Sequence, residues 1–329
     1  MANFDVAMKM LFESDQAVAD VFNLCIGKGQ TLIAPSMIRP ATEREIELRR
    51  HSDRRLHARE RTKDIVRCIH WNQENPDDYF LLGLENQLQP HYLMPWRVQE
   101  SYHLFFGRQL RLIKRQHKAS NTPKTPAEFL SGCPKGTLFP RVLTIVIYWG
   151  TEKWDAPVKY TDMVRPPPFK EVRRYDPKWS YPLLVPAKLS LDKIGNVKEK
   201  ILEIALKYAW AVQNKRRLKT LLEERADIRN VPKGIAKGLV EISGTMCEID
   251  EQQETVNMCN AVQELIKEGR KEGRKEGRKE GRKEEREQNA RNFAAYLQTQ
   301  SMPVRKVRST LRKWFRLATK DLDRICPLL

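Results

Sequence analysis

The stretch YFLLGLENQ, residues 79–87, decides the fold class of this chain. Its first six residues form a nearly continuous apolar run, which is typical of a strand that is covered on both faces. Three polar residues, Glu85, Asn86 and Gln87, follow directly. Polar groups at the tip of a buried strand indicate a functional site at that point.

Two further β-prone runs lie on either side of this stretch. The run IVRCIHW at 65–71 ends before NPDD at 75–78, which supplies turn-forming residues. The run RVLTIVIYW at 141–149 is the third predicted strand, and a helix from Pro95 to about Gln116 precedes it. The expected fold class is therefore α/β.

Helical spacing predominates at both ends of the chain. Apolar residues three and four positions apart predict an amphipathic helix within residues 3–25. The region 191–267 has mostly helical patterns, and the tail from Asn289 predicts two short helices broken at Pro303. We expect four segments, namely 1–190, 191–267, 268–288 and 289–329.

Residues 268–283 are four consecutive copies of Glu-Gly-Arg-Lys. A period of four is close to one helical turn, and it places each Glu three residues before a Lys, a pair that contributes roughly 0.2–0.5 kcal/mol. Each glycine opposes this by about 1 kcal/mol relative to alanine. The segment 268–288 is therefore expected to be a marginal helix or a solvated linker.

The composition indicates a soluble, basic protein. The chain has 329 residues, with 60 Lys and Arg against 42 Asp and Glu, and its formal net charge of +18 predicts attraction to a polyanion such as nucleic acid or an anionic membrane face. No run reaches the roughly 18 apolar residues of a membrane span, and of the two polyanions we expect DNA as the partner and no membrane. No secretory signal is visible, and the six cysteines have no Cys-x-x-Cys spacing, so we expect reduced thiols in the cytoplasm.

Two carboxylates lie at the ends of neighbouring predicted strands. Asp64 precedes the first strand and Glu85 ends the second, so adjacent strands would bring them together. Two close carboxylates stay ionised only with a cation between them, and hard oxygen ligands suit Mg²⁺ or Mn²⁺. An ion held by Asp64, Glu85 and the backbone carbonyl of Asn86 would activate water for phosphodiester cleavage. The simpler alternative is that both residues merely end strands beside surface cations.

These residues resemble the core of the recombination-promoting nuclease family, which is also described as transposase-like and belongs to the PD-(D/E)XK nuclease superfamily. The similarity extends over most of the chain, and its most specific part joins ENQ at 85–87 to HYLMPWRVQESY at 91–102. The other matching pieces are Asp5 with Lys9 and Phe12, Arg61 through Val66, EFLSGC at 128–133, TIVIYWG at 144–150, Trp154-Asp155, Asn257-Met258-Cys259 and the Glu-Gly-Arg-Lys array. The resemblance implies a restriction-endonuclease-like αβββαβ core within 1–190 and Mg²⁺-dependent cleavage of DNA.

The resemblance also assigns roles to individual residues. Asp64 and Glu85 fall on metal ligands and Gln87 on the third motif position, so these three are the expected catalytic residues. Asp5 matches a first-helix acid and is a further candidate ligand. The wider superfamily usually has lysine where this chain has Gln87, although glutamine is usual in the family. Because an amide cannot take up a proton, Gln87 would orient the attacking water or hold a phosphate oxygen, and the base would be metal-bound hydroxide or the substrate phosphate.

Several cations are candidates for binding the substrate. Arg97 lies in the first turn of the helix after ENQ, where backbone N–H groups and the helix dipole favour an anion. It would clamp the scissile phosphate, or it would be an exposed arginine paired with Glu100 or Glu85. The other candidates are Arg54, Arg55, Arg59 and Arg61. Their arginine-rich stretch is either a DNA-backbone contact, which would give salt-sensitive binding with little sequence preference, or a solvated loop.

The sequence thus predicts a cytoplasmic, Mg²⁺-dependent DNA endonuclease associated with recombination or mobile elements. One alternative is a DNA-binding accessory protein of a mobile element that has lost catalysis, which the missing lysine and the positive charge favour. A third hypothesis is an interaction protein that forms homo-oligomers through its C-terminal helical and repeat region.

Overall fold

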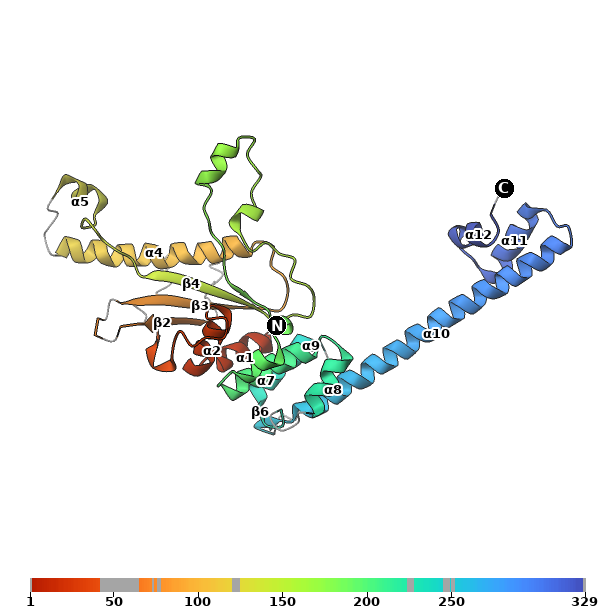
Figure 1. Ribbon diagram of the computed structural model, residues 1–329, viewed down its shortest axis with the longest axis horizontal. Coiled ribbons are helices and arrows are strands. Elements are labelled where there is room, and N and C mark those ends of the chain that lie inside the picture. Colours follow the sequence, from red (N-terminus) through yellow and green to blue (C-terminus); the bar gives the residue numbers. More distant parts are fainter. Residues whose placement is uncertain are drawn as a thin grey trace, which may run out of the picture. The chain divides into compact units, whose positions relative to one another are not determined.

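The computed structural model describes residues 2–41, 65–72, 74–75, 78–119, 125–223, 228–244, 249 and 252–327 (Figure 1). By their contacts the residues form two compact units, Met1–Val262 and Gln263–Leu329. The division expected between residues 190 and 191 lies inside the first unit. The fold class is mixed α/β, as predicted, with a five-stranded mixed sheet and a helical C-terminal region.

The sheet follows the chain order β1-β2-β3-β4-β5. Its strands are β1 (Ile38–Pro40), β2 (Ile65–His70), β3 (Tyr79–Gln87), β4 (Arg141–Tyr148) and β5 (Leu183–Leu184). The pairs β1–β2 and β2–β3 are antiparallel, whereas β3–β4 and β4–β5 are parallel. The three strands that the sequence predicts are confirmed as β2, β3 and β4.

The strand β3 is paired further along β4 than along β2. In the described residues the β2–β3 pairing ends with Ile65 opposite Leu84, whereas the β3–β4 pairing continues to Gln87 opposite Tyr148. The parallel strands β3 and β4 therefore end side by side. Their shared carboxyl edge bears the three polar residues that follow the apolar part of β3.

Helix α4 (Met94–Ala119) covers one face of the sheet (Figure 1). Its buried Val98 packs with Val146 and Tyr148 of β4, and its Phe105 packs with Leu81 of β3. The helix begins at Met94, one residue before the start expected from the sequence. The short helix α5 (Pro126–Ser131) follows, with Thr125 at its N-cap.

Two helices, α1 (Ala2–Leu11) and α2 (Asp15–Cys25), cover the other face. The sequence predicts one helix within 3–25, and this prediction is wrong because the structure has two helices there. The Ser14 hydroxyl caps the start of the second helix by accepting a hydrogen bond from the backbone N–H of Ala17 at 3.3 Å. Phe22 contacts Phe80 of β3, with ring centroids 5.8 Å apart. Since side chains alternate along a strand, Phe80 and Leu81 face opposite sides of the sheet.

The region 191–267 is mostly helical, as predicted. It contains α6 (Leu191–Gly195), α7 (Lys200–Ala211), α8 (Lys215–Glu223), α9 (Lys233–Ser243) and a small pair of strands, β6 (Val231–Pro232) and β7 (Thr255–Val256). Elsewhere in the described residues, 3₁₀ helices lie at Pro35–Met37, Tyr160–Asp162, Lys170–Tyr175 and Pro186–Lys188.

This helical region shares a core with the N-terminal helices. The Asp20 carboxylate on α2 accepts hydrogen bonds from the backbone N–H groups of Lys198 and Glu199, at 2.9 and 2.8 Å, just before α7. Helix α9 packs so closely on α1 that a Cβ atom at Gly238 would lie 2.2 Å from the Cβ of Ala7. Glycine is therefore the residue that permits this helix contact.

The second unit consists of most of α10 (Met258–Thr299) with α11 (Val304–Phe315) and α12 (Thr319–Ile325). The Glu-Gly-Arg-Lys array lies within α10, so of the two forms expected for it the structure has the helix. The predicted break at Pro303 is found between α10 and α11. A small core is formed by Ala290, Ala294, Leu297, Val307, Leu311, Leu317, Leu322 and Cys326. No helix among the described residues is long and apolar enough to cross a membrane.

Candidate functional site

Glu85 is a buried carboxylate at the carboxyl end of β3, with a side chain that is 4% exposed. It forms an ion pair with Arg97 of α4, and it accepts a hydrogen bond from Nε2 of Gln87 at 3.0 Å. Both contacts are made by Oε1 of Glu85. Glu85, Gln87 and Arg97, which the sequence analysis singled out, are thus in contact with one another through this oxygen.

The local structure explains why these side chains meet. Glu85 and Gln87 are two positions apart on a strand, so they lie on the same face of the sheet, and this is the face that α4 covers. Arg97 lies in the first turn of α4 and reaches back over the end of β3. Its side chain is 34% exposed, so the ion pair joins a buried carboxylate to a cation that reaches the surface.

Asn86 lies on the opposite face and has a structural contact there. Its side-chain oxygen accepts a hydrogen bond from Nε1 of Trp149 at 2.9 Å, and the backbone N–H of Trp149 donates to the carbonyl oxygen of Gln87 at 2.9 Å. These bonds fix the ends of β3 and β4 together. Sequence reasoning placed Trp149 at the end of the predicted strand 141–149 and assigned it no role, because its contact with Asn86 depends on how β3 and β4 are paired.

Several predicted site residues lie outside the described residues, namely Asp64, Arg54, Arg55, Arg59 and Arg61. The first described residue after Asp64 is Ile65, which pairs with Leu84, the residue that precedes Glu85. Asp5 is described, and it is exposed on α1, whereas Glu85 lies on the face that α4 covers.

The predicted metal site is described only in part. Within the residues that the structure describes, no group of three or more His, Cys, Asp or Glu side chains could hold a metal ion. Of the expected donors, Glu85 and the backbone of Asn86 are described. A carboxylate buried at a strand end is a hard oxygen donor of the kind Mg²⁺ prefers, so Glu85 fits the ion. The guanidinium of Arg97 already supplies positive charge beside Oε1 of Glu85.

Aromatic side chains surround this edge of the sheet. Tyr148, at the end of β4, is buried, and its ring lies 5.0 Å from that of Trp154. Burial raises the pKa of Tyr148, and the carboxylates of Glu152 and Asp155 raise it further. The hydroxyl of Tyr92 donates to Asp155 at 3.4 Å, while Trp96 is 55% exposed one residue before Arg97. Exposed rings beside a cation are suited to contact with nucleotide bases.

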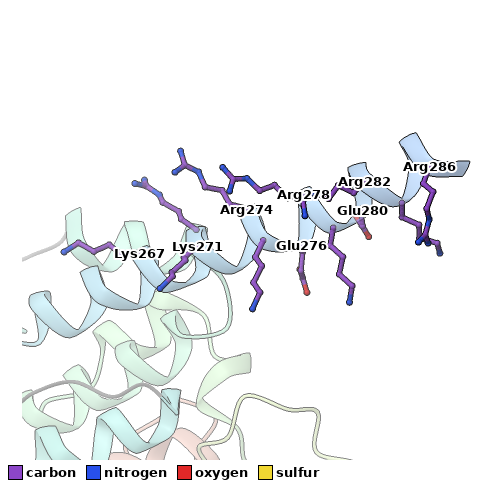
Figure 2. A pocket seen from close by; sticks show the side chains of 12 residues that line it. Lys267, Lys271, Arg274, Glu276, Arg278, Glu280, Arg282 and Arg286 are labelled. Carbon is purple, nitrogen blue, oxygen red and sulfur yellow. The ribbon is translucent and has the colours of Figure 1, made fainter. Parts of the chain in front are cut away.

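A second candidate surface lies on α10. Figure 2 shows twelve side chains along the repeat array of α10, and ten of the twelve are Lys or Arg. Arg274 and Arg278 project from one side of the helix and Glu276 from the other, because two residues correspond to about 200° of rotation. Like charges recur every four residues and repel one another along the helix. A polyanion bound along the arginines would relieve that repulsion.

Comparison of this chain with protein-family models, with curated proteins and with solved structures finds no match.

Proposed function

We propose that the chain is a metal-dependent DNA endonuclease that hydrolyses phosphodiester bonds. The observation that carries this proposal is the buried carboxylate of Glu85, which Arg97 and Gln87 contact at the carboxyl end of β3. A buried carboxylate is costly unless it is paired, and a buried ionisable group with a specific charge partner is a candidate for a functional site.

The order of the elements supports a restriction-endonuclease-like core. Helices α1 and α2 precede β1, β2 and β3, after which α4 leads to β4. Apart from the additional helices α2 and α5, this order is similar to the αβββαβ order of that fold. The strand register supports the paired-carboxylate site, because the described neighbours of Asp64 and Glu85, namely Ile65 and Leu84, lie opposite each other.

The chain's own groups would divide the work in the following way. Glu85, Asp64 and the backbone carbonyl of Asn86 would hold Mg²⁺ or Mn²⁺, and the bound ion supplies a water of lowered pKa and positive charge beside the phosphate. Gln87 donates to Glu85 and thereby fixes the direction of the carboxylate. Arg97 is the cation placed to hold a phosphate oxygen, since a third of its side chain is exposed.

DNA would be held mainly through its phosphates. The net charge of +18 and the basic side chains along α10 support attraction to the backbone, which carries no sequence information by itself. Binding should therefore weaken steeply as salt is added. An association of the protein with recombination or mobile elements would follow from the same cleavage of DNA.

The test is cleavage of a supercoiled plasmid in Mg²⁺, Mn²⁺ or EDTA, with matched variants. Glu85→Gln and Asp64→Ala should each reduce the rate to about a thousandth or less, because both remove metal-assisted activation of water. Glu203→Gln is the control, since Glu203 is also buried and ion-paired, to Lys200 and Lys207, but belongs to α7. The control should cut at the wild-type rate.

The outcomes separate the interpretations. Loss of cleavage in both site variants, with DNA binding retained and the control active, supports the nuclease. A folded Glu85→Gln protein that cuts at the wild-type rate in Mg²⁺ would show that the active site is wrongly assigned. A preparation whose cleavage is unaffected by every variant points to a contaminating nuclease.

A second candidate function is a DNA-binding accessory protein without catalysis. The observation that favours it is the Glu85–Arg97 ion pair, which neutralises the buried carboxylate without a metal. The same plasmid assay distinguishes the two functions. An accessory protein would retard DNA in a gel equally well with Mg²⁺ or EDTA and would leave the plasmid supercoiled in both.

A further inference from the structure

The C-terminal module, defined as residues 288–327, has a basic surface that the proposed nuclease site does not use. Its helix α11 contains five Lys or Arg residues and no Asp or Glu among 12 residues. Val307 and Leu311 face the core of the module and are fully buried. Four of the five cations, all except Arg308, are exposed on the remaining part of this amphipathic helix.

Two arginines of α11 are engaged within the module. Arg308 is 12% exposed, forms an ion pair with Asp323 of α12 and donates to the carbonyl oxygens of Leu322 and Cys326. Arg312 donates to the hydroxyl of Thr319 at 3.0 Å. These contacts hold α12 against α11, so these two arginines have structural partners.

The other cations of this surface face solvent. They are Arg305, Lys306, Lys313 and, directly after α11, Arg316. Within the part of the chain that the structure describes, none of these four forms an ion pair. An unneutralised cation cluster of this kind is an electrostatic binding surface for an anionic partner.

An aromatic row includes Trp314, which directly follows Lys313 in α11. The ring of Phe293 on α10 lies 5.5 Å from Trp314, at an interplanar angle of 18°, and 6.4 Å from Tyr296, at 22°. Trp314 is 68% exposed and Tyr296 is 59% exposed. Phe293 thus has two nearly parallel ring partners, and both partners are exposed enough to contact a further ring.

We propose that the C-terminal module binds unpaired nucleic acid strands, with bases stacking on Trp314 and Tyr296 while Arg305, Lys306, Lys313 and Arg316 contact the phosphates. Aromatic rings interleaved with cations are the recurrent means of holding single strands without sequence preference. In a duplex both faces of each base are covered by its neighbours, so the aromatic row selects the unpaired strand. The inference shares with the proposed function only the class of ligand and needs no cleavage.

The test measures binding of a fluorescently labelled oligothymidine and of a labelled duplex to the full-length protein in EDTA. Trp314→Ala should weaken binding of oligothymidine about tenfold and leave duplex binding within about twofold, because it removes one stacking ring. Trp314→Phe retains a ring and should restore most of the affinity. Trp71→Ala is the matched control, since Trp71 is also exposed but lies in the first unit, and it should bind both ligands as the wild type does.

The phosphate contacts have their own readout. Replacing Arg305 and Lys313 together by alanine should reduce the salt dependence of oligothymidine binding by about 0.7 in log–log slope for each cation removed. Arg308→Ala is unsuitable for this purpose because Arg308 connects α11 to α12.

Three results would overturn the inference. One is wild-type affinity of Trp314→Ala for oligothymidine in a protein that unfolds at the wild-type temperature. Another is an equal loss of affinity for single strand and duplex. The third is binding to phosphatidylserine vesicles with no binding to either oligonucleotide, which would assign the surface to a membrane. Because all arms contain EDTA, an inactive nuclease site would not affect any of them.

Discussion

Arg97 in the first turn of α4 forms an ion pair with Glu85 at the end of β3. The cation reaches the surface, whereas the carboxylate is buried, so the two residues depend on the pair to different extents. Removal of the cation leaves a buried negative charge without this partner, whereas removal of the carboxylate leaves an arginine that water can solvate.

Arg97→Met should therefore destabilise the protein more than Glu85→Gln does. We expect about 1–3 kcal/mol for Arg97→Met, below the cost of breaking a fully buried pair because Arg97 is partly exposed. Urea unfolding measures this difference. Addition of Mg²⁺ should recover more stability in Arg97→Met than in the wild type if a cation binds beside Glu85, and equal recovery would argue against a metal at that position.

Gln87 should affect the rate of cleavage and leave the fold intact. Gln87→Ala removes the hydrogen bond that orients Glu85, so we expect slower plasmid cleavage with little change in thermal unfolding. Gln87→Lys should fold like the wild type, because this strand end is partly exposed. Its rate of plasmid cleavage shows whether a cationic amine can function at this position. An unchanged rate in Gln87→Ala would remove this residue from the site.

A chain ending after Ile266 should fold. The cut falls close to the boundary between the two units at residues 262 and 263, and it removes the array with the C-terminal module. Each Glu-Gly-Arg-Lys unit carries one net positive charge, so DNA affinity should fall and its salt dependence should become shallower. Aggregation of the truncated chain, or unfolding at a much lower temperature, would mean that the removed part stabilises the first unit.

Alkaline pH should destabilise the first unit through Tyr102, which is partly buried against β4. Burial raises the pKa of Tyr102 above its ordinary value near 10, so this side chain stays protonated in the folded state. Above about pH 10 the unfolded chain loses the proton first, and stability therefore falls as pH rises. Between about pH 9 and pH 11, the urea midpoint of Tyr102→Phe should fall less than that of the wild type. The variant also loses the hydrogen bond from the Thr144 backbone N–H at 3.2 Å, which lowers its midpoint at every pH and leaves the comparison of slopes unaffected. Parallel slopes would exclude Tyr102 as the cause.

Arg308 and Arg305 give a paired test of the C-terminal module. Both are arginines of α11, but Arg308 is engaged with Asp323 and two carbonyl groups, whereas Arg305 faces solvent. Arg308→Ala should increase the hydrogen exchange of amides in α11 and α12, because it removes their polar link. Arg305→Ala should leave exchange unchanged. Equal exchange in the two variants would mean that the apolar core alone holds the helices together.

The main strands could be predicted because their apolar runs are long. The stretches 79–87 and 141–149 show a continuous pattern, and the structure has β3 and β4 at these places. The strands β1 and β5 have three and two residues, too few for any periodicity to show. The break between α1 and α2 depends on one hydroxyl, that of Ser14, which the apolar stripe within residues 3–25 does not reveal.

The candidate site was predictable where it depends on neighbours in the chain. Glu85 and Gln87 share a face by simple alternation, and pairing of Arg97 with Glu85 was among the interpretations that the sequence left open. The contact between Asn86 and Trp149 was not predictable, since it depends on the register of two parallel strands separated by α4 and α5. Placement of Asp64 lies outside the described residues, so its part in the site stays a prediction.

The outer strands of the described sheet are its two shortest, β1 and β5. Strand β1 includes Pro40, which lacks an N–H donor, beside exposed Arg39, and β5 lies between Pro182 and Pro186. Both borders therefore offer few backbone groups for hydrogen bonding to a foreign strand, which is how natural sheets avoid joining edge to edge. A sheet with a centre as apolar as β3 and β4 would otherwise be prone to self-association at the high local concentrations of a growing polysome.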